Sequence, residues 1–119
     1  MKKFLIVEDD HNRIAWFHNI FPDVELFITD KPKEAIEWLK EHEFETIFLD
    51  HDLGDKVYED SGPGTGFEVA QYLSEIDYKH QVILHTCNPI GAVNMSRVLT
   101  NYTVLPFPRF IELYKEGGV

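Results

Sequence analysis

Short apolar runs alternate along the chain with segments in which apolar residues recur at helical spacing. The runs of strand length lie at residues 4–7, 24–28, 46–49, 82–84 and 102–105. Such alternation is typical of βαβ units that wind around a parallel sheet. The pattern therefore predicts an α/β fold made of five βα units.

Residues that start and stop helices separate these runs. Asp and Asn are favoured caps, Pro is favoured in the first turn, and Gly is favoured after the last. The signals are Asp10 and Pro22 for the first helix, Asp30 and Pro32 for the second, Asn88 and Pro89 for the fourth, and Gly117 and Gly118 for the last, which we expect over 107–116. The apolar positions Phe67, Ala70 and Leu73 predict the third helix.

The composition fits one domain over residues 1–119. Of these residues 44% are hydrophobic and 13% aromatic, which is enough for a core. The single Cys87 excludes an internal disulfide and fits a reducing compartment. The apolar run at 4–7 is too short for a signal peptide or a membrane span. We therefore expect a cytoplasmic protein that does not enter a membrane.

The chain carries 21 acidic and 11 basic residues, a formal net charge of −10. This charge repels a duplex phosphate backbone unless basic residues cluster, and no basic run is longer than Lys2-Lys3. We therefore do not expect binding to duplex DNA. The composition leaves open a small phosphorylated ligand, a nucleic-acid end held through a metal ion, or a protein partner.

Polar residues that could carry chemistry follow three of the predicted strands. They are Glu8-Asp9-Asp10 after the first strand, Asp50-His51-Asp52 after the third, and His85-Thr86-Cys87-Asn88 after the fourth. Open parallel sheets bind ligands at the carboxyl ends of their strands, and in a doubly wound order 2-1-3-4-5 these three ends are neighbours. The segment 50–66, rich in Gly and acids, is predicted to be a long functional loop.

Carboxylates that converge repel one another unless a cation lies among them. We therefore predict a divalent ion held by Glu8, Asp9 and Asp50, with Asp52 as a further ligand. Oxygen ligands suit Mg²⁺, Mn²⁺ or Ca²⁺, and an added imidazole favours Mn²⁺ and other transition ions. The alternative is that the acids are only solvated. For Asp10, a role as helix cap is the better interpretation.

His51 and His85 are candidates for an acid, a base or a metal ligand. His51 lies between two aspartates, and His85 ends an apolar strand. General acid–base groups are most often histidines, but a histidine is also often a partly buried structural residue, and both interpretations stay open for each. Thr86 can donate to a phosphoryl oxygen. Asn88 can present backbone N–H groups to an anion at a helix start, or simply cap the helix.

Together these residues resemble the response-regulator receiver domain over nearly the whole chain. In that family an acidic pair and a phosphoacceptor aspartate hold Mg²⁺, a Thr or Ser ends strand four, and Lys-Pro follows an aromatic residue on strand five. The matching positions are Glu8 and Asp9, Asp50, Thr86, and Tyr102. Leu105-Pro106 replaces Lys-Pro, which argues against conventional phosphorelay. The resemblance implies a single CheY-like (βα)5 domain, a flavodoxin-like three-layer sandwich with strand order 2-1-3-4-5.

Two motifs resemble more closely a divergent receiver group, the cyclic-phosphate processing receiver domains. That group has LDHDLG-type and H-[ST]-x-N-P-x-G-x-x-x-M-type motifs. Residues 49–54 and 85–91, followed by Met95, match them, and the segment 64–70 is also similar. The resemblance implies that the protein processes a cyclic phosphate.

The resulting hypothesis is a metal-dependent phosphoesterase that opens a cyclic phosphate at an RNA end or in a small nucleotide, with Mg²⁺ or Mn²⁺ as the ion. Its candidate catalytic residues are Asp50, His51, His85 and Thr86, and its candidate phosphate-binding residues are Thr86 and Asn88. Asp50 acting as a nucleophile is a variant of this hypothesis. Two alternatives stay open: a signalling receiver phosphorylated on Asp50, and a catalytically idle receiver that binds a protein.

Overall fold

Strands and helices alternate along the chain in a computed structural model that describes residues 1–53 and 62–115. In chain order the elements are β1 (Lys3–Val7), α1 (His11–Ile20), β2 (Glu25–Thr29), α2 (Pro32–Glu41), β3 (Thr46–Leu49), α3 (Gly66–Glu75), β4 (Gln81–Leu84), α4 (Pro89–Val98), β5 (Tyr102–Val104) and α5 (Phe107–Lys115). The predicted strands are confirmed to within one residue at each end. Gly54, and the expected end of the last helix at Glu116, Gly117 and Gly118, lie outside the described residues.

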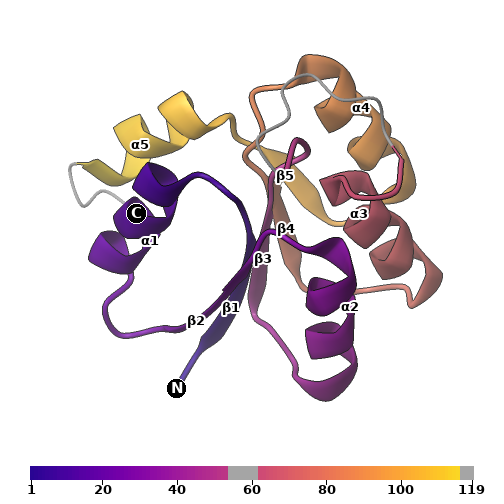
Figure 1. Cartoon of the computed structure of the whole chain (residues 1–119), viewed down its shortest axis with the longest axis horizontal. Coiled ribbons are helices and arrows are strands. Elements are labelled where there is room, and N and C mark those ends of the chain that lie inside the picture. The colour runs from indigo at the N-terminus through magenta and orange to yellow at the C-terminus, as the bar shows by residue number, and fades with distance from the viewer. Residues whose placement is uncertain (54–61, 116–119) are drawn as a thin grey trace.

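The strands form one parallel sheet in the order β2-β1-β3-β4-β5, as predicted. Val7 pairs with Leu49, and Leu49 pairs with Leu84, so β1, β3 and β4 end in one row. Figure 1 shows α1 and α5 on one face of the sheet and α2, α3 and α4 on the other. The architecture is the three-layer flavodoxin-like α/β sandwich that the sequence predicts.

Alternate strand residues enter two hydrophobic cores, one on each face of the sheet, because side chains point to opposite faces along a strand. Leu49 and Leu84 belong to the core that also contains Leu73 of α3 and Met95 of α4. The core under α1 and α5 is rich in aromatic rings; it contains Ile6, Phe17, Phe48, Ile83, Phe107 and Phe110. The alternation that assigns residues to these cores also orients the side chains just beyond the strand ends.

The helix starts show which predicted caps form. The Asp10 side chain accepts from Asn12 N at 2.9 Å and Arg13 N at 3.0 Å, so its capping role is confirmed. Asn88 caps α4, with its Oδ1 accepting from Gly91 N at 3.0 Å.

The start of α2 differs from the prediction at one residue. The helix begins at Pro32 as expected, but the cap position is Lys31, not Asp30, and no side chain caps it. Thr29 Oγ1 instead accepts from Lys31 N at 3.0 Å. The β2 residue Thr29 thus fixes the entry into α2.

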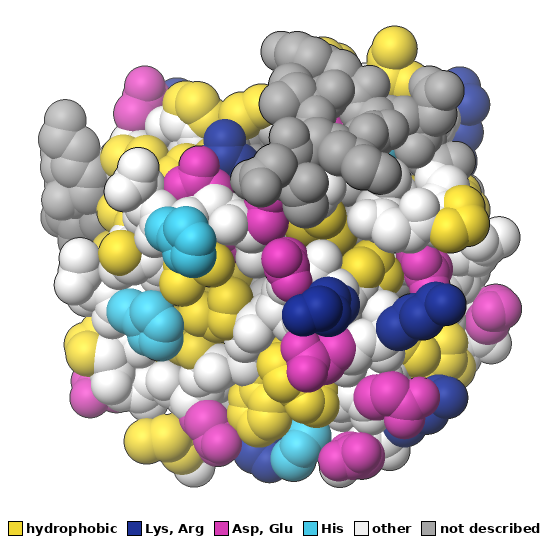
Figure 2. All heavy atoms as spheres, viewed as in Figure 1, with side chains coloured by type: hydrophobic (Ala, Val, Ile, Leu, Met, Phe, Trp, Pro, Cys, Tyr) yellow, Lys and Arg dark blue, Asp and Glu magenta, His cyan; other side chains and the backbone are white. Residues whose placement is uncertain are grey.

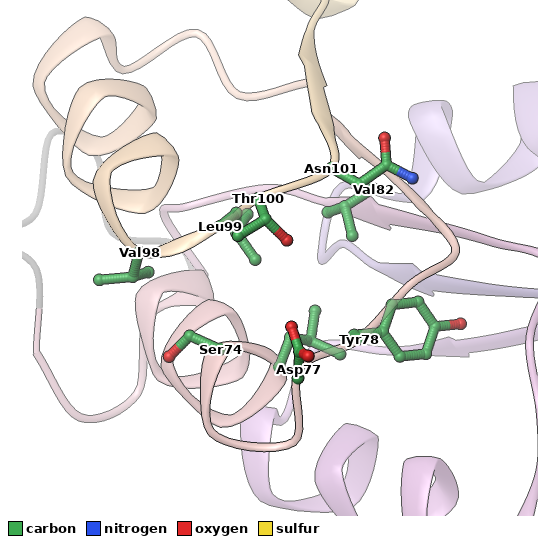
Figure 3. Close-up of a pocket in the computed structure, with 9 residues that line it drawn as sticks. Ser74, Asp77, Tyr78, Val82, Val98, Leu99, Thr100 and Asn101 are labelled. Atoms are coloured by element: carbon green, nitrogen blue, oxygen red, sulfur yellow. The ribbon is translucent and has the colours of Figure 1, made fainter.

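A small cavity lies at the opposite edge of the sheet from the carboxyl strand ends. Its volume is about 30 Å³, and the end of α3, the start of β4 and the residues after α4 line it (Figure 3). This space can hold water but not a nucleotide. The carboxyl edge is therefore the better place to look for a ligand site.

Two further observations concern the charges on the surface and the lengths of the helices. On the face shown in Figure 2, basic side chains are scattered among acidic ones. None of the helices within 1–53 and 62–115 is both long and apolar enough to cross a membrane.

Candidate functional site

Glu8, Asp50 and His85 each lie one residue beyond the carboxyl end of a strand, in β1, β3 and β4 respectively. The sheet hydrogen bonding continues through them, with Asp50 N donating to Val7 O and His85 N to Leu49 O, both at 3.0 Å. By strand alternation they share a face with Ile6, Phe48 and Ile83, two residues earlier in each strand. One potential ligand atom of each lies within 4.8 Å of the others.

The Glu8 carboxylate is buried and fully hydrogen-bonded. His85 Nε2 donates to Oε1 at 2.8 Å, and the backbone N–H groups of Asp9 and Asp10 donate to Oε2 at 3.1 Å. Burial by itself raises the pKa of Glu8, but the hydrogen bond and charge of His85, the Asp10 N–H and Arg13 outweigh it and lower the pKa to about 2. Glu8 is therefore ionised at neutral pH.

The His85 ring is completely buried and offers one nitrogen to the site. Its edges meet Phe17 and Phe107, with ring centroids 5.6 and 6.2 Å away. Nδ1 is buried and has no hydrogen-bond partner among the described residues. Nε2, bonded to Glu8, is consequently the atom through which His85 takes part in the group.

Hydrogen bonds and neighbouring charges stabilise the ionised form of Asp50 less well than that of Glu8. Its Oδ1 accepts from His51 N at 2.8 Å. Burial is the main influence on Asp50; with the charge of Glu8 it outweighs the lowering effects of His85, Thr86 and the His51 N–H and raises the pKa to about 6. The raised pKa of Asp50 thus reflects its burial first and the neighbouring charge of Glu8 second.

Arg13 reaches both carboxylates, although it was not among the predicted site residues. Its Nη1 lies 3.6 Å from Glu8 Oε1 and 3.7 Å from Asp50 Oδ2. Burial by itself lowers the pKa of Arg13, but the charges of Glu8 and Asp50 outweigh it and raise the pKa. The signal in the sequence was its position in the first turn of the helix that follows the β1 acids, which places it at the same edge.

The donor set fits a divalent ion. Two buried carboxylates and one imidazole are ligands that Mg²⁺, Mn²⁺ and other transition ions accept. A dication would also stabilise the ionised form of Asp50, which burial and the charge of Glu8 disfavour. Asp9, also predicted as a ligand, is not part of the group formed by Glu8, Asp50 and His85; it lines a hollow of about 300 Å³ together with Thr29 and Lys31.

Asp52, His51 and Asn88 form a second polar cluster. Asp52 Oδ1 accepts from His51 Nδ1 at 2.8 Å and from Asn88 Nδ2 at 3.1 Å. His51 is completely buried, and by strand alternation it lies on the opposite face from Asp50. The structure therefore places the predicted ligand Asp52 with His51, outside the group formed by Glu8, Asp50 and His85.

Thr86 and Gly66 lie next to Asp50. Thr86 is buried, forms a side-chain hydrogen bond that lowers the pKa of Asp50, and accepts from Asn88 N at 3.1 Å. A Cβ on Gly66 would lie 1.8 Å from Asp50 O, so α3 can start here only with glycine. Gly66 N also donates to His51 O at 2.9 Å. The start of α3 thus holds the Asp50–His51 peptide in place.

Comparison with solved structures finds response-regulator receivers. The response regulator TrrA from Thermotoga maritima, in complex with Mg²⁺-BeF, has a TM-score of 0.69 at 21% identity, covering 98% of this chain and 96% of that one. The Mn²⁺-bound form of response regulator Rcp1 has a TM-score of 0.64 at 18% identity, covering 100% and 97%. A CheY-like receiver domain from Methanospirillum hungatei JF-1 has a TM-score of 0.64 at 19% identity, covering 98% and 93%. These similarities establish the receiver fold.

Comparison with protein families and curated sequences narrows the assignment. Among curated proteins, no sequence matches the chain significantly. Residues 4–101 match the family described as cyclic-phosphate processing receiver domain. This match spans most of the chain and includes both strand-end motifs that carry the polar groups. The chain belongs to the cyclic-phosphate processing receiver domain family.

Proposed function

We propose that this protein is a metal-dependent phosphoesterase that opens a cyclic phosphate in a small nucleotide or at an RNA end. The observation that carries the proposal is the convergence of Glu8, Asp50 and His85 into one buried group. Membership of the cyclic-phosphate processing family supports the substrate class. A phosphate ester is also the kind of anion that a metal centre with a neighbouring arginine can bind.

Glu8 and Asp50 supply the two buried carboxylates for Mg²⁺ or Mn²⁺. Asp9, the next residue after Glu8, is the proposed further ligand. When bound, a divalent ion polarises a phosphoryl oxygen and lowers the pKa of a bound water. Asp52 would assist from the second cluster, where it holds His51 and Asn88. The protein's part is to keep the carboxylates of Glu8 and Asp50 close together in a buried place.

Opening a cyclic phosphate adds water to phosphorus and breaks one bond from phosphorus to a ribose oxygen. The water must lose a proton, and the departing oxygen must gain one. We assign proton transfer to His85 in preference to His51, because His85 Nε2 lies within the group and the His51 ring is packed beneath Gly91. The hydrogen bond from His85 Nε2 to Glu8 Oε1, at 2.8 Å, holds the imidazole in the group.

Thr86 and Asn88 would hold the phosphate. Thr86 lies beside Asp50, so its hydroxyl can donate to a non-bridging oxygen of a phosphoryl group bound there. Asn88 caps α4 and donates from Nδ2 to Asp52, which fixes the turn between Thr86 and the helix. The first turn of α4 then presents its N-terminus to the same edge.

The test is chromatography of 2′,3′-cyclic nucleotides, 3′,5′-cyclic nucleotides and cyclic-phosphate RNA ends after incubation with the protein and Mg²⁺, Mn²⁺ or a chelator. His85→Ala removes the imidazole in the group. His80→Ala is the matched control, because His80 pairs with Glu43 away from the site. We expect metal-dependent opening that is lost in His85→Ala and retained in His80→Ala. Absence of turnover with metal bound would contradict the esterase proposal for these substrates.

A second candidate function is phosphorylation of Asp50 in a signalling receiver. It is supported by the side-chain hydrogen bond between Thr86 and Asp50, a hydroxyl and a carboxylate at the positions that receivers use. Leu105, which replaces the receiver lysine, packs against the aromatic core and provides no charge. Incubation with acetyl phosphate and mass spectrometry would separate the two functions, since a phosphoryl group retained on Asp50 favours the signalling role.

A further inference from the structure

Glu8 and Asp50 share a cation that belongs to the protein itself. Arg13 Nη1 lies 3.6 Å from one carboxylate and 3.7 Å from the other. Among the residues that the structure describes, no lysine and no other arginine forms an ion pair with either acid. The carboxylates that would bind a metal ion are therefore already paired with a guanidinium.

The Arg13 side chain is held in this position from more than one side. Its guanidinium lies over the ring of Phe107, 4.9 Å from the centroid, and Nη2 approaches Cys87 Sγ at 3.8 Å. Arginine favours stacking of this kind on an aromatic face. The side chain is only 26% exposed. It is thus an ordered part of the site and not a solvated surface charge.

We propose that Arg13 is a resident counter-cation of the Glu8–Asp50 pair and competes with the divalent ion for these carboxylates. An ion bound between the two acids would stand close to a guanidinium that now contacts the same oxygens, and like charges at such a distance repel. Metal binding therefore displaces the guanidinium from at least one carboxylate. The released guanidinium can donate two parallel hydrogen bonds to a pair of phosphoryl oxygens. Metal binding therefore prepares an anion-binding site at the same edge of the sheet.

The competition needs the metal site but not the cyclic-phosphate reaction, so the metal alone tests it. Mn²⁺ affinity is measured by electron paramagnetic resonance titration of the wild type and of Arg13→Gln, which removes the charge and keeps a similar length. Arg97→Gln is the matched control, because it changes the net charge equally from an exposed position in α4. We expect Arg13→Gln to bind Mn²⁺ about fivefold more tightly or better, the lower range of coupling between two sites, and Arg97→Gln to bind as the wild type does.

Unchanged or weaker Mn²⁺ binding by Arg13→Gln would overturn the proposal, and so would a wild type that binds no Mn²⁺. Should the variant fail to fold, the wild type gives the answer by nuclear magnetic resonance. The side-chain Nε–H signal of Arg13 should move when Mg²⁺ saturates the protein, and a signal that stays in place rejects the competition. Tighter binding by Arg13→Gln together with no turnover would support this inference and reject the esterase proposal alone.

Discussion

Gly91 packs directly on the ring of His51. A Cβ on residue 91 would lie 2.4 Å from His51 Cγ and 2.7 Å from Cδ2, closer than real contacts permit. The first turn of α4 therefore rests on a completely buried imidazole that also donates to Asp52. This contact explains in physical terms why glycine follows the Asn88-Pro89 start of the helix.

Gly91→Ala should lower the free energy of unfolding by about 1–3 kcal/mol, because the added methyl group must displace either the His51 ring or α4. Gly62→Ala is the control, since a Cβ at residue 62 would meet nothing within 4 Å. Urea unfolding of both variants measures the difference. Equal stability of the two would show that the helix moves freely over the ring and that the contact is not tight.

Asp50→Asn should stabilise the metal-free protein at pH 7 and abolish its stabilisation by metal. The wild type buries the Asp50 charge beside Glu8 at a pKa raised to about 6, and the neutral amide removes that repulsion. Metal at about 100 times its dissociation constant stabilises a folded protein by about 2.7 kcal/mol. Thermal unfolding in chelator and in Mn²⁺ measures both effects.

Asp23→Asn, an exposed change in the turn between α1 and β2, serves as the control for Asp50→Asn and should keep the metal response. A response to Mn²⁺ that survives in Asp50→Asn would place the ion elsewhere.

His85→Gln should separate proton transfer from metal binding. Glutamine can still donate to Glu8 Oε1 but cannot act as an acid or base near neutral pH. Turnover of a cyclic phosphate should fall by about 10²–10⁴-fold, the usual contribution of general acid–base catalysis, while Mn²⁺ affinity stays nearly constant. A parallel loss of Mn²⁺ affinity would instead make His85 a metal ligand.

Because of Tyr78, we expect the free energy of unfolding to fall in strong base. Its hydroxyl donates to Phe44 O, and burial, followed by the charge of Glu43, raises the pKa of Tyr78 to about 12. A pKa raised on folding stabilises the folded state below the unfolded value of about 10, and this contribution disappears as the pH rises through 12.

The difference in unfolding free energy between the wild type and Tyr78→Phe should therefore shrink between pH 10 and about 12. Tyr102→Phe, at a 41% exposed position, is the matched control for the loss of a tyrosine hydroxyl. A pH-independent difference for Tyr78→Phe would mean that its hydroxyl titrates equally in both states.

The sequence allowed the approximate strand ends to be predicted, because apolar runs and caps are local signals, whereas the strand order was predicted from the resemblance to receiver domains. It also identified the three segments that meet at the carboxyl edge. The predicted caps of α1 and α4 are correct, because the side chains of Asp10 and Asn88 accept hydrogen bonds from backbone N–H groups in the first turn of each helix.

Other properties of the site depend on tertiary packing. The approach of Arg13 to Asp50 depends on how α1 lies across the sheet, and the contact of Gly91 with His51 depends on the docking of α4. Neither distance is encoded in spacing along the chain.

Because side chains alternate between the faces of the sheet, a shift of one residue in β3 would change which side chain enters the buried group. Asp50 and His51 are adjacent in sequence yet point to opposite faces of the sheet, so deletion of one residue inside β3 would move His51 into the position of Asp50. The buried group would then contain a second imidazole where it now has a carboxylate, and the other face would gain an acid. The loss of a single codon would thereby change an oxygen-rich site into a nitrogen-rich one.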